Sequence, residues 1–121
     1  MRYRRDEAFR FEFGEPLPIV FTIEEMNGSH VETSDGKASL LDISLRGMKI
    51  CTSLSIPIDR QSNVKVSIQF QLNHNNYTIQ GIIVWKKQRF TEYFYGIQFT
   101  TSSETQDALL DDLKIIGKRM A

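Results

Sequence analysis

Apolar and polar residues alternate along most of the chain, and this alternation predicts a protein built mainly of strands. The clearest case is Val64–Leu72, where the two kinds of residue take turns over the whole segment. A period of two residues is typical of a strand with one buried and one exposed face. Similar segments, bounded by turn-forming residues, predict strands at residues 17–26, 30–33, 37–45, 48–53, 77–90 and 93–100. The pair Asn27-Gly28 favours a hairpin turn, because both residues tolerate positive φ.

The apolar period changes near the C-terminus, where residues 103–120 predict one amphipathic helix. Ser103 and Gln106 have the spacing of a capping box, which places the start of this helix. An apolar stripe with the helical period follows, made of Leu109, Leu113, Ile116 and Met120, with Leu110 beside it. The charged residues of the segment lie off the stripe: Asp111, Asp112, Lys114, Lys118 and Arg119.

Strands and helix together predict the fold class. In residues 81–85 apolar side chains fall on both faces of the expected strand, so this strand needs cover on both sides. A chain of 121 residues fits one domain. We therefore expect an all-β domain with a C-terminal helix, in which a small antiparallel barrel of six or seven strands is capped by the amphipathic helix.

Charge and composition exclude several classes of protein. Fifteen basic and fifteen acidic side chains give a formal charge of zero. Proteins that coat polymeric nucleic acid usually carry a positive excess, because they neutralise phosphates; a small anionic ligand held by a local cluster is still compatible. Cys51 is the only cysteine and cannot form an internal disulfide, which favours a cytoplasmic protein. No apolar run approaches the ~20 residues of a membrane span, and the first residues lack the apolar stretch of a signal peptide.

The residues that usually carry catalysis form no recognisable site. His30 and His74 fall near expected turns without the spacing of metal ligands, so we expect both to be exposed. Cys51 lies within an expected strand with no evident general base, and we expect it to be a small buried residue. No glycine-rich phosphate loop is present. The sequence therefore predicts a protein that is not an enzyme and that uses no metal or cofactor.

The N-terminal arm could bind phosphate. Half of the arginines, namely Arg2, Arg4, Arg5 and Arg10, lie within the first ten residues, interleaved with aromatic residues. The planar fork of an arginine grips phosphate through two donors and also stacks on flat rings. Acidic neighbours such as Asp6 and Glu7 offset this charge, so the arm alone fits a solvated terminus equally well.

A second candidate site lies where the third expected strand ends. Polar and apolar residues alternate there, which places Asp42, Ser44 and Arg46 on the face opposite Leu41, Ile43 and Leu45. Gly47 follows and permits a tight turn or a close approach of a ligand. A carboxylate can accept hydrogen bonds from the N1–H and exocyclic amine of guanine, and arginine can donate to its O6 and N7. An ordinary polar face followed by a hairpin glycine is the alternative interpretation.

These residues resemble a known family. Asp42-x-Ser44-x-x-Gly47 is similar to the D/N-x-S-x-x-G motif of the PilZ domain family, which are bacterial receptors for cyclic di-GMP. The arginine-rich start resembles the other motif of that family. Residues 81–85 resemble its late barrel strand, and residues 95–99 resemble its G-x-x-F strand. The resemblance covers nearly the whole chain, including the terminal helix.

The resemblance implies a single PilZ-like domain over residues 1–121, with an arginine-rich arm at 1–10, a barrel at 16–100 and a helix at 103–120. The implied ligand-binding residues are Arg4, Arg5, Arg10, Asp42, Ser44 and Gly47. The arginines would grip phosphates and stack on guanine, Asp42 and Ser44 would read a guanine edge, and Gly47 would let the backbone approach. The chain would then be a non-catalytic second-messenger receptor that orders its arm on cyclic di-GMP and signals to an unidentified partner protein.

One departure from the family pattern keeps an alternative open. The family separates its paired arginines from the third arginine by three residues, whereas four residues separate Arg5 from Arg10 here. This spacing favours a degenerate PilZ-like domain that binds proteins but no nucleotide. A third possibility, a binder of single-stranded nucleic acid, follows from the small barrel, and the zero net charge counts against it.

Overall fold

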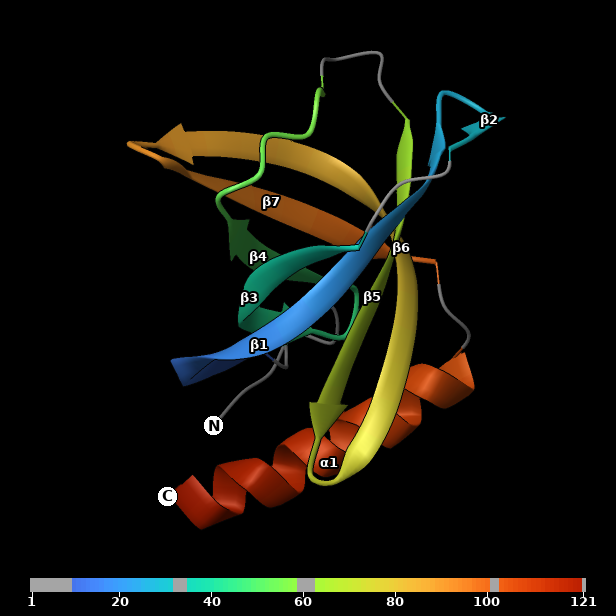
Figure 1. Ribbon diagram of the computed structural model, residues 1–121. Coiled ribbons are helices and arrows are strands. Elements are labelled where there is room, and N and C mark those ends of the chain that lie inside the picture. The colour runs from blue at the N-terminus through green and yellow to red at the C-terminus, as the bar shows by residue number, and fades with distance from the viewer. Residues whose placement is uncertain (1–9, 32–34, 59–62, 101–102, 121) are drawn as a thin grey trace.

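The computed structural model describes residues 10–31, 35–58, 63–100 and 103–120, and it confirms the expected fold class (Figure 1). One antiparallel sheet of seven strands is followed by a C-terminal helix. The elements are β1 (Arg10–Met26), β2 (Ser29–His30), β3 (Gly36–Ser44), β4 (Gly47–Thr52), β5 (Val64–Leu72), β6 (Asn75–Arg89), β7 (Glu92–Phe99) and α1 (Ser103–Met120). The strand order is β2-β1-β3-β4-β7-β6-β5, and an additional pairing joins β1 to β5.

The long strand β1 closes the barrel because it pairs with two partners. It pairs with β3 from Arg10, opposite Ser44, to Phe21, opposite Gly36, and it pairs with β5 from Val20 onward. The strand was expected to start at residue 17 but already starts at Arg10, which therefore belongs to the sheet. A shift of register between Glu12 and Leu17 interrupts the apolar alternation, which explains why the sequence pattern missed the first part of the strand.

In three hairpins the last paired residues of the two strands enclose a turn of two residues. Asn27 and Gly28 connect β1 to β2, and Asn73 and His74 connect β5 to β6, all four with positive φ. This is the pattern of a type I′ turn, and it confirms the hairpin predicted from Asn27-Gly28. The third turn joins β6 to β7 and begins with Phe90, whose φ is 55°. The strand expected at residues 30–33 is limited to Ser29–His30; residues 32–34 lie outside the described residues.

Strand β3 corrects one detail of the predicted alternation. Leu41 was expected to share the buried face with Ile43, but Leu40 and Ile43 are the residues that are fully buried. The pairing of β3 with β4 shifts register between Leu40 and Asp42. A bulge at this point changes the face on which the next side chains lie, so a strict period of two gives the wrong face for Leu41.

Helix α1 lies across one end of the barrel, beside the β5–β6 turn (Figure 1). Leu109 and Leu113 are buried and join the barrel core, as the helical stripe predicted, and Ile116 packs against them at the edge. Asp112 was expected on the polar side of the helix but is also buried, with 6% of its surface exposed. The helix therefore presents a carboxylate as well as leucines to the barrel.

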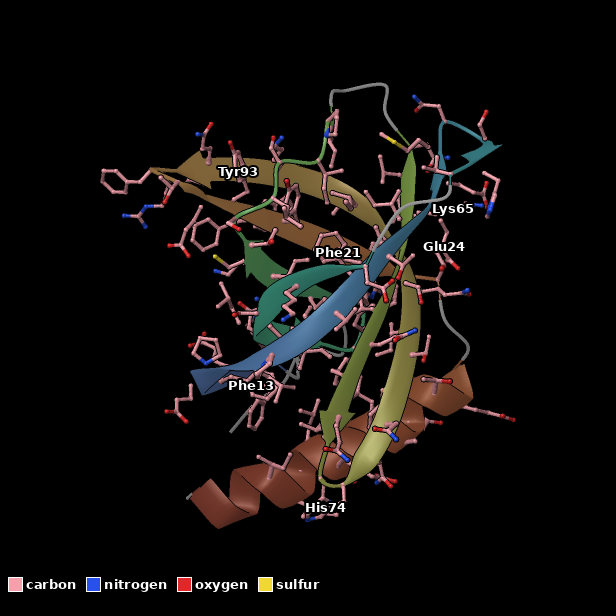
Figure 2. The ribbon with its side chains drawn as sticks, viewed as in Figure 1. Phe13, Phe21, Glu24, Lys65, His74 and Tyr93 are labelled. Carbon is pink, nitrogen blue, oxygen red and sulfur yellow. The ribbon has the colours of Figure 1, made fainter. Side chains whose placement is uncertain are left out.

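The buried carboxylate of Asp112 binds the helix to the β5–β6 hairpin. It accepts hydrogen bonds from Asn73 Nδ2 at 3.0 Å, from Asn75 Nδ2 at 2.8 Å and from the Tyr77 hydroxyl. Figure 2 shows His74, between the two asparagines in the chain, at the tip of this hairpin beside the helix. Burial raises the pKa of Asp112, but the three hydrogen bonds outweigh it and the pKa is lowered overall. Burial, together with the contact to Asp112, raises the pKa of Tyr77, so the phenol keeps its proton and donates it to the carboxylate.

Candidate functional site

Three segments that are far apart in the sequence meet at a hollow on the barrel: the start of β1, the β3–β4 turn, and the paired strands β6 and β7. The hollow has a volume of about 380 Å³. It is lined by Arg10, Asp42, Ser44, Arg46, Gly47, Met48, Lys49, Val84, Trp85, Gly96, Ile97 and Gln98. Four of the six candidate residues named from the sequence thus surround one site. The other two, Arg4 and Arg5, lie outside the described residues.

The carboxylate of Asp42 is held between two cations. Arg10 Nη1 donates to Asp42 Oδ1 at 2.9 Å, and Lys49 Nζ lies 3.7 Å from Asp42 Oδ2. Sheet register produces this arrangement, because Lys49 pairs with Asp42 across β3 and β4, while Arg10 starts the neighbouring strand opposite Ser44. Asp42 is only 8% exposed, whereas most of the Arg10 side chain is in solvent. The acid is therefore fixed in place and the arginine is the accessible member of the pair.

Ser44 holds the turn that follows Asp42. Its hydroxyl accepts hydrogen bonds from the N–H groups of Arg46 at 3.4 Å and Gly47 at 3.3 Å, and it donates to the Gly47 carbonyl at 3.2 Å. Serine hydroxyls commonly organise turns in this way. In the free protein Ser44 thus shapes the β3–β4 turn, and its part in base recognition stays a prediction.

Gly47 is required by the barrel itself. A Cβ atom at this position would lie 2.2 Å from the carbonyl oxygen of Ile97, so no other residue fits without moving β7. A neighbouring strand of the same chain thus lies close to this glycine, and the approach of a ligand at Gly47 stays a prediction. The tight β4–β7 contact also brings Gln98, the register partner of Gly47, into the wall of the hollow.

Trp85 supplies an aromatic surface that the sequence motif did not indicate. Its indole lies over Gly96, where a Cβ atom would come 1.9 Å from Trp85 Nε1. A glycine opposite a large ring is what allows that ring to lie against a sheet. Trp85 is 42% exposed and lines the same hollow as Arg10 and Lys49. The pairing of a tryptophan with a glycine on the next strand could have revealed it, once the register of β6 and β7 was known.

The charge of the hollow favours an anion. Arg10, Arg46 and Lys49 line it together with one carboxylate, Asp42, so the basic side chains are in excess. A larger hollow of about 570 Å³ lies where β1 separates from β5, but Lys37 is its one charged lining residue. Cations, an oriented carboxylate and an exposed ring therefore meet only in the smaller of these two hollows. This combination suits a ligand that carries both phosphate and a planar base.

The two histidines and the cysteine do not line this hollow. His30 and His74 are exposed, as expected. Cys51 was expected to be buried but is partly exposed, and its thiol donates to Glu92 Oε2 at 3.3 Å. Burial, together with this carboxylate, raises the pKa of Cys51 to about 11, so the thiol stays protonated at neutral pH.

Among the described residues, no group of histidine, cysteine and acidic side chains could hold a metal ion. The described part of the chain also contains no helix with the length and apolar character that a membrane span requires.

Comparisons with known proteins agree with this fold. Residues 3–114 match the model of the PilZ domain. The structure is similar to the PilZ domain of CeSA from a cellulose-synthesizing bacterium, with 12% identity and a TM-score of 0.60, covering 91% of this chain and 99% of that one. It is also similar to MrkH of K. pneumonia in its apo state, with 19% identity and a TM-score of 0.66, covering 100% of this chain and 56% of that one. No curated protein matches the sequence.

Proposed function

Because the chain belongs to the PilZ domain family, whose members are generally receptors for cyclic di-GMP, we propose that it binds this dinucleotide in the hollow between β1, the β3–β4 turn and β6–β7. The proposed role is that of a non-catalytic cytoplasmic receptor that passes the signal to a partner protein. One observation carries it: Arg10, Asp42 and Trp85 converge on the same hollow from three separate segments.

Each of these side chains has a chemistry that fits part of the ligand. The fixed Asp42 carboxylate would accept hydrogen bonds from the N1–H and exocyclic amine of one guanine. The exposed guanidinium of Arg10 would bind a phosphate through its planar fork. The indole of Trp85 would stack on a base, an interaction that contributes about 1–3 kcal/mol per base in other nucleotide-binding proteins. Arg4 and Arg5, from the N-terminal arm, would add further phosphate contacts.

In the free protein the charges of Arg10 and Asp42 already neutralise each other, so binding of the ligand has to replace this ion pair by new contacts. Arg10 and Asp42 form an ion pair at 2.9 Å. The ligand would draw Arg10 toward a phosphate and replace it at Asp42 with the guanine donors. Lys49, on the other side of the carboxylate, would keep Asp42 compensated during the exchange. The ion pair therefore holds both side chains in position without closing the site.

A protein-binding domain without nucleotide affinity is the second candidate. The specific observation in its favour is the spacing of the arginines, with four residues between Arg5 and Arg10. Arg10 lies in strand β1, so the extra residue must be accommodated before this position. Binding measurements on the intact protein separate the two candidates.

Replacing Asp42 is expected to change the choice of base. Asp42→Ala removes the acceptor for the guanine donors, so affinity for cyclic di-GMP should fall about tenfold to a hundredfold, since hydrogen bonds to charged groups contribute roughly 1.5–3 kcal/mol. Affinity for cyclic di-AMP should hardly change, because adenine lacks this donor pair. Isothermal titration with both dinucleotides measures the difference.

Asp107→Ala, which removes an exposed carboxylate on α1, is the matched control and should bind like the unmodified protein. Because Asp42 is buried, the titrations are done well below the melting temperature of each variant. An equal loss of affinity for both dinucleotides would contradict base recognition by Asp42.

Saturation with cyclic di-GMP is expected to slow amide hydrogen exchange in residues 2–9 by at least about tenfold. Arginines that bind phosphate cannot leave their backbone free, so the arm must become ordered with the ligand. Exchange followed by mass spectrometry, with and without ligand, gives the comparison. Unchanged exchange in this segment at saturation would mean that Arg4 and Arg5 take no part in binding.

A further inference from the structure

The hairpin of β6 and β7 ends in a turn whose backbone conformation is strained. Phe90 is its first central residue, with a φ of 55° and 91% of its surface exposed. The type I′ and II′ turns that close two-residue hairpins place positive φ at this position and favour glycine or asparagine there. The equivalent positions of the other two-residue turns hold Asn27 and Asn73. A bulky aromatic residue here is strained, and it gains nothing from packing.

The base of this hairpin is firmly anchored, so the tip is held in a defined place. Lys86 Nζ donates to Ser55 Oγ at 2.9 Å and to the Ile56 carbonyl at 2.8 Å, and it lies 5.0 Å from the ring centroid of Tyr93. Pairing of β7 with β4 ends at Tyr93, which Figure 2 labels on this hairpin. Residues 89–92 thus extend past the end of β4, and Figure 1 shows the hairpin projecting from the body of the barrel.

Two basic residues, Lys87 and Arg89, lie on one face of β6 next to this tip. The pairing of β6 with β7 runs without a register shift from Trp85 to Arg89, so Trp85, Lys87 and Arg89 share a face. Within the described part of the chain neither Lys87 nor Arg89 forms an ion pair. Glu92, the register partner of Arg89, lies on the same face, where its carboxylate accepts the hydrogen bond of the Cys51 thiol. An exposed aromatic side chain beside an arginine is typical of a protein interface, where both kinds of residue are enriched.

We propose that the tip of the β6–β7 hairpin docks on an acidic surface of a partner protein, with the Phe90 ring entering an apolar pocket and Lys87 and Arg89 facing carboxylates around it. A membrane fits less well, because one ring and two cations offer little of the apolar area and basic charge on which membrane binding depends. The strip begins at Trp85, so a partner at the tip would lie next to the ligand hollow. The inference rests on the hairpin alone and holds whether or not the hollow binds a dinucleotide.

The first test asks whether Phe90 serves the fold. Phe90→Gly removes the strain and an exposed ring, so the melting temperature should stay the same or rise by about 3–5 °C. A lower melting temperature would show that the ring stabilises the domain and would overturn the proposal.

The second test identifies the molecule that docks on the hairpin tip. The photocrosslinker p-benzoylphenylalanine is placed at position 90 of the full chain in its native host, without added dinucleotide, and at Thr78, exposed near the other end of β6, as the control. We expect one protein adduct from position 90 and none from position 78. The adduct should be lost when Lys87→Glu and Arg89→Glu are combined, and kept when Lys37→Glu and Lys114→Glu make the same change of charge elsewhere.

The captured protein, purified separately, should bind the unmodified chain at least tenfold more tightly than Phe90→Ala, and the affinity should fall with added salt. A lipid adduct, an adduct with a second copy of this chain, no adduct, or an adduct that survives the charge reversal would each overturn the proposal. Because the hollow is not involved in these measurements, their failure and the failure of cyclic di-GMP binding are distinguishable.

Discussion

Removal of residues 103–121 is expected to leave a chain that no longer unfolds in a cooperative transition. Leu109 and Leu113 are buried in the barrel core, and the helix also supplies the Asp112 carboxylate. Burial of a leucine stabilises a protein by about 1.5–3 kcal/mol, so these two residues alone approach the lower end of the 5–15 kcal/mol that is usual for a domain. Thermal unfolding followed by circular dichroism is the measurement. A truncated chain that stays soluble and melts cooperatively would show that α1 is an accessory to the barrel.

Single substitutions in α1 show whether the helix stabilises the domain through its buried side chains or through its presence as a whole. Leu113→Ala, at a position that is 2% exposed, should lower the free energy of unfolding by about 2–5 kcal/mol. Ile115→Ala, at a position that is 42% exposed, should change it by less than about 0.5 kcal/mol. Similar losses from the two variants would contradict the packing described for this helix.

Asp112→Ala is expected to lower the free energy of unfolding by about 2–4 kcal/mol. The substitution leaves the amides of Asn73 and Asn75 and the hydroxyl of Tyr77 without their acceptor. A buried donor that loses its partner costs about 1–3 kcal/mol. Water can reach the two asparagines, and the Tyr77 hydroxyl, 3.1 Å from the Ala108 carbonyl, can donate its one proton to that oxygen instead, so the total stays below the sum of three full losses. Asp111→Ala, the exposed neighbour, is the control and should have little effect in chemical denaturation.

The same variant gives a pH dependence with a definite sign. The pKa of Asp112 in the folded protein is below its ordinary value of 3.8, because the hydrogen bonds favour the charged form. Its contribution to stability is therefore complete above that ordinary value and is lost as the pH falls through the folded pKa. The difference between the unmodified protein and Asp112→Ala should be constant from about pH 5 to 8 and shrink below about pH 4. A difference that grows on acidification would contradict an ionised Asp112.

Periodicity was a good guide to this fold wherever the sheet is regular. It predicted Val64–Leu72 with the bounds that β5 has, and it predicted the helix and its buried leucines. It failed at Leu41 and at the start of β1, because bulges there break the period of two. It also failed at Asp112, since a buried carboxylate is stable only when donors from a distant hairpin surround it. Those donors come from the β5–β6 turn, and no pattern within the helix could reveal them.

The candidate site was predictable to the extent that its residues are close in the sequence. Asp42, Ser44 and Gly47 follow one another through a single turn, and the motif that they form resembles a known family. Trp85 and Lys49 reach the hollow through the register of β6 with β7 and of β4 with β3. Register depends on bulges and on tertiary packing, so these two residues could be recognised only from the structure.

The most direct measurement of the central claim is isothermal titration of the intact protein with cyclic di-GMP in low-salt buffer. We expect saturable heat of binding, an affinity for cyclic di-AMP that is much lower, and about tenfold to a hundredfold weaker binding of cyclic di-GMP by Arg10→Ala, because a charge-assisted hydrogen bond contributes roughly 1.5–3 kcal/mol. Absence of any heat from a protein that melts cooperatively in the same buffer would contradict the receptor function, and the domain would then be an adaptor that binds proteins alone.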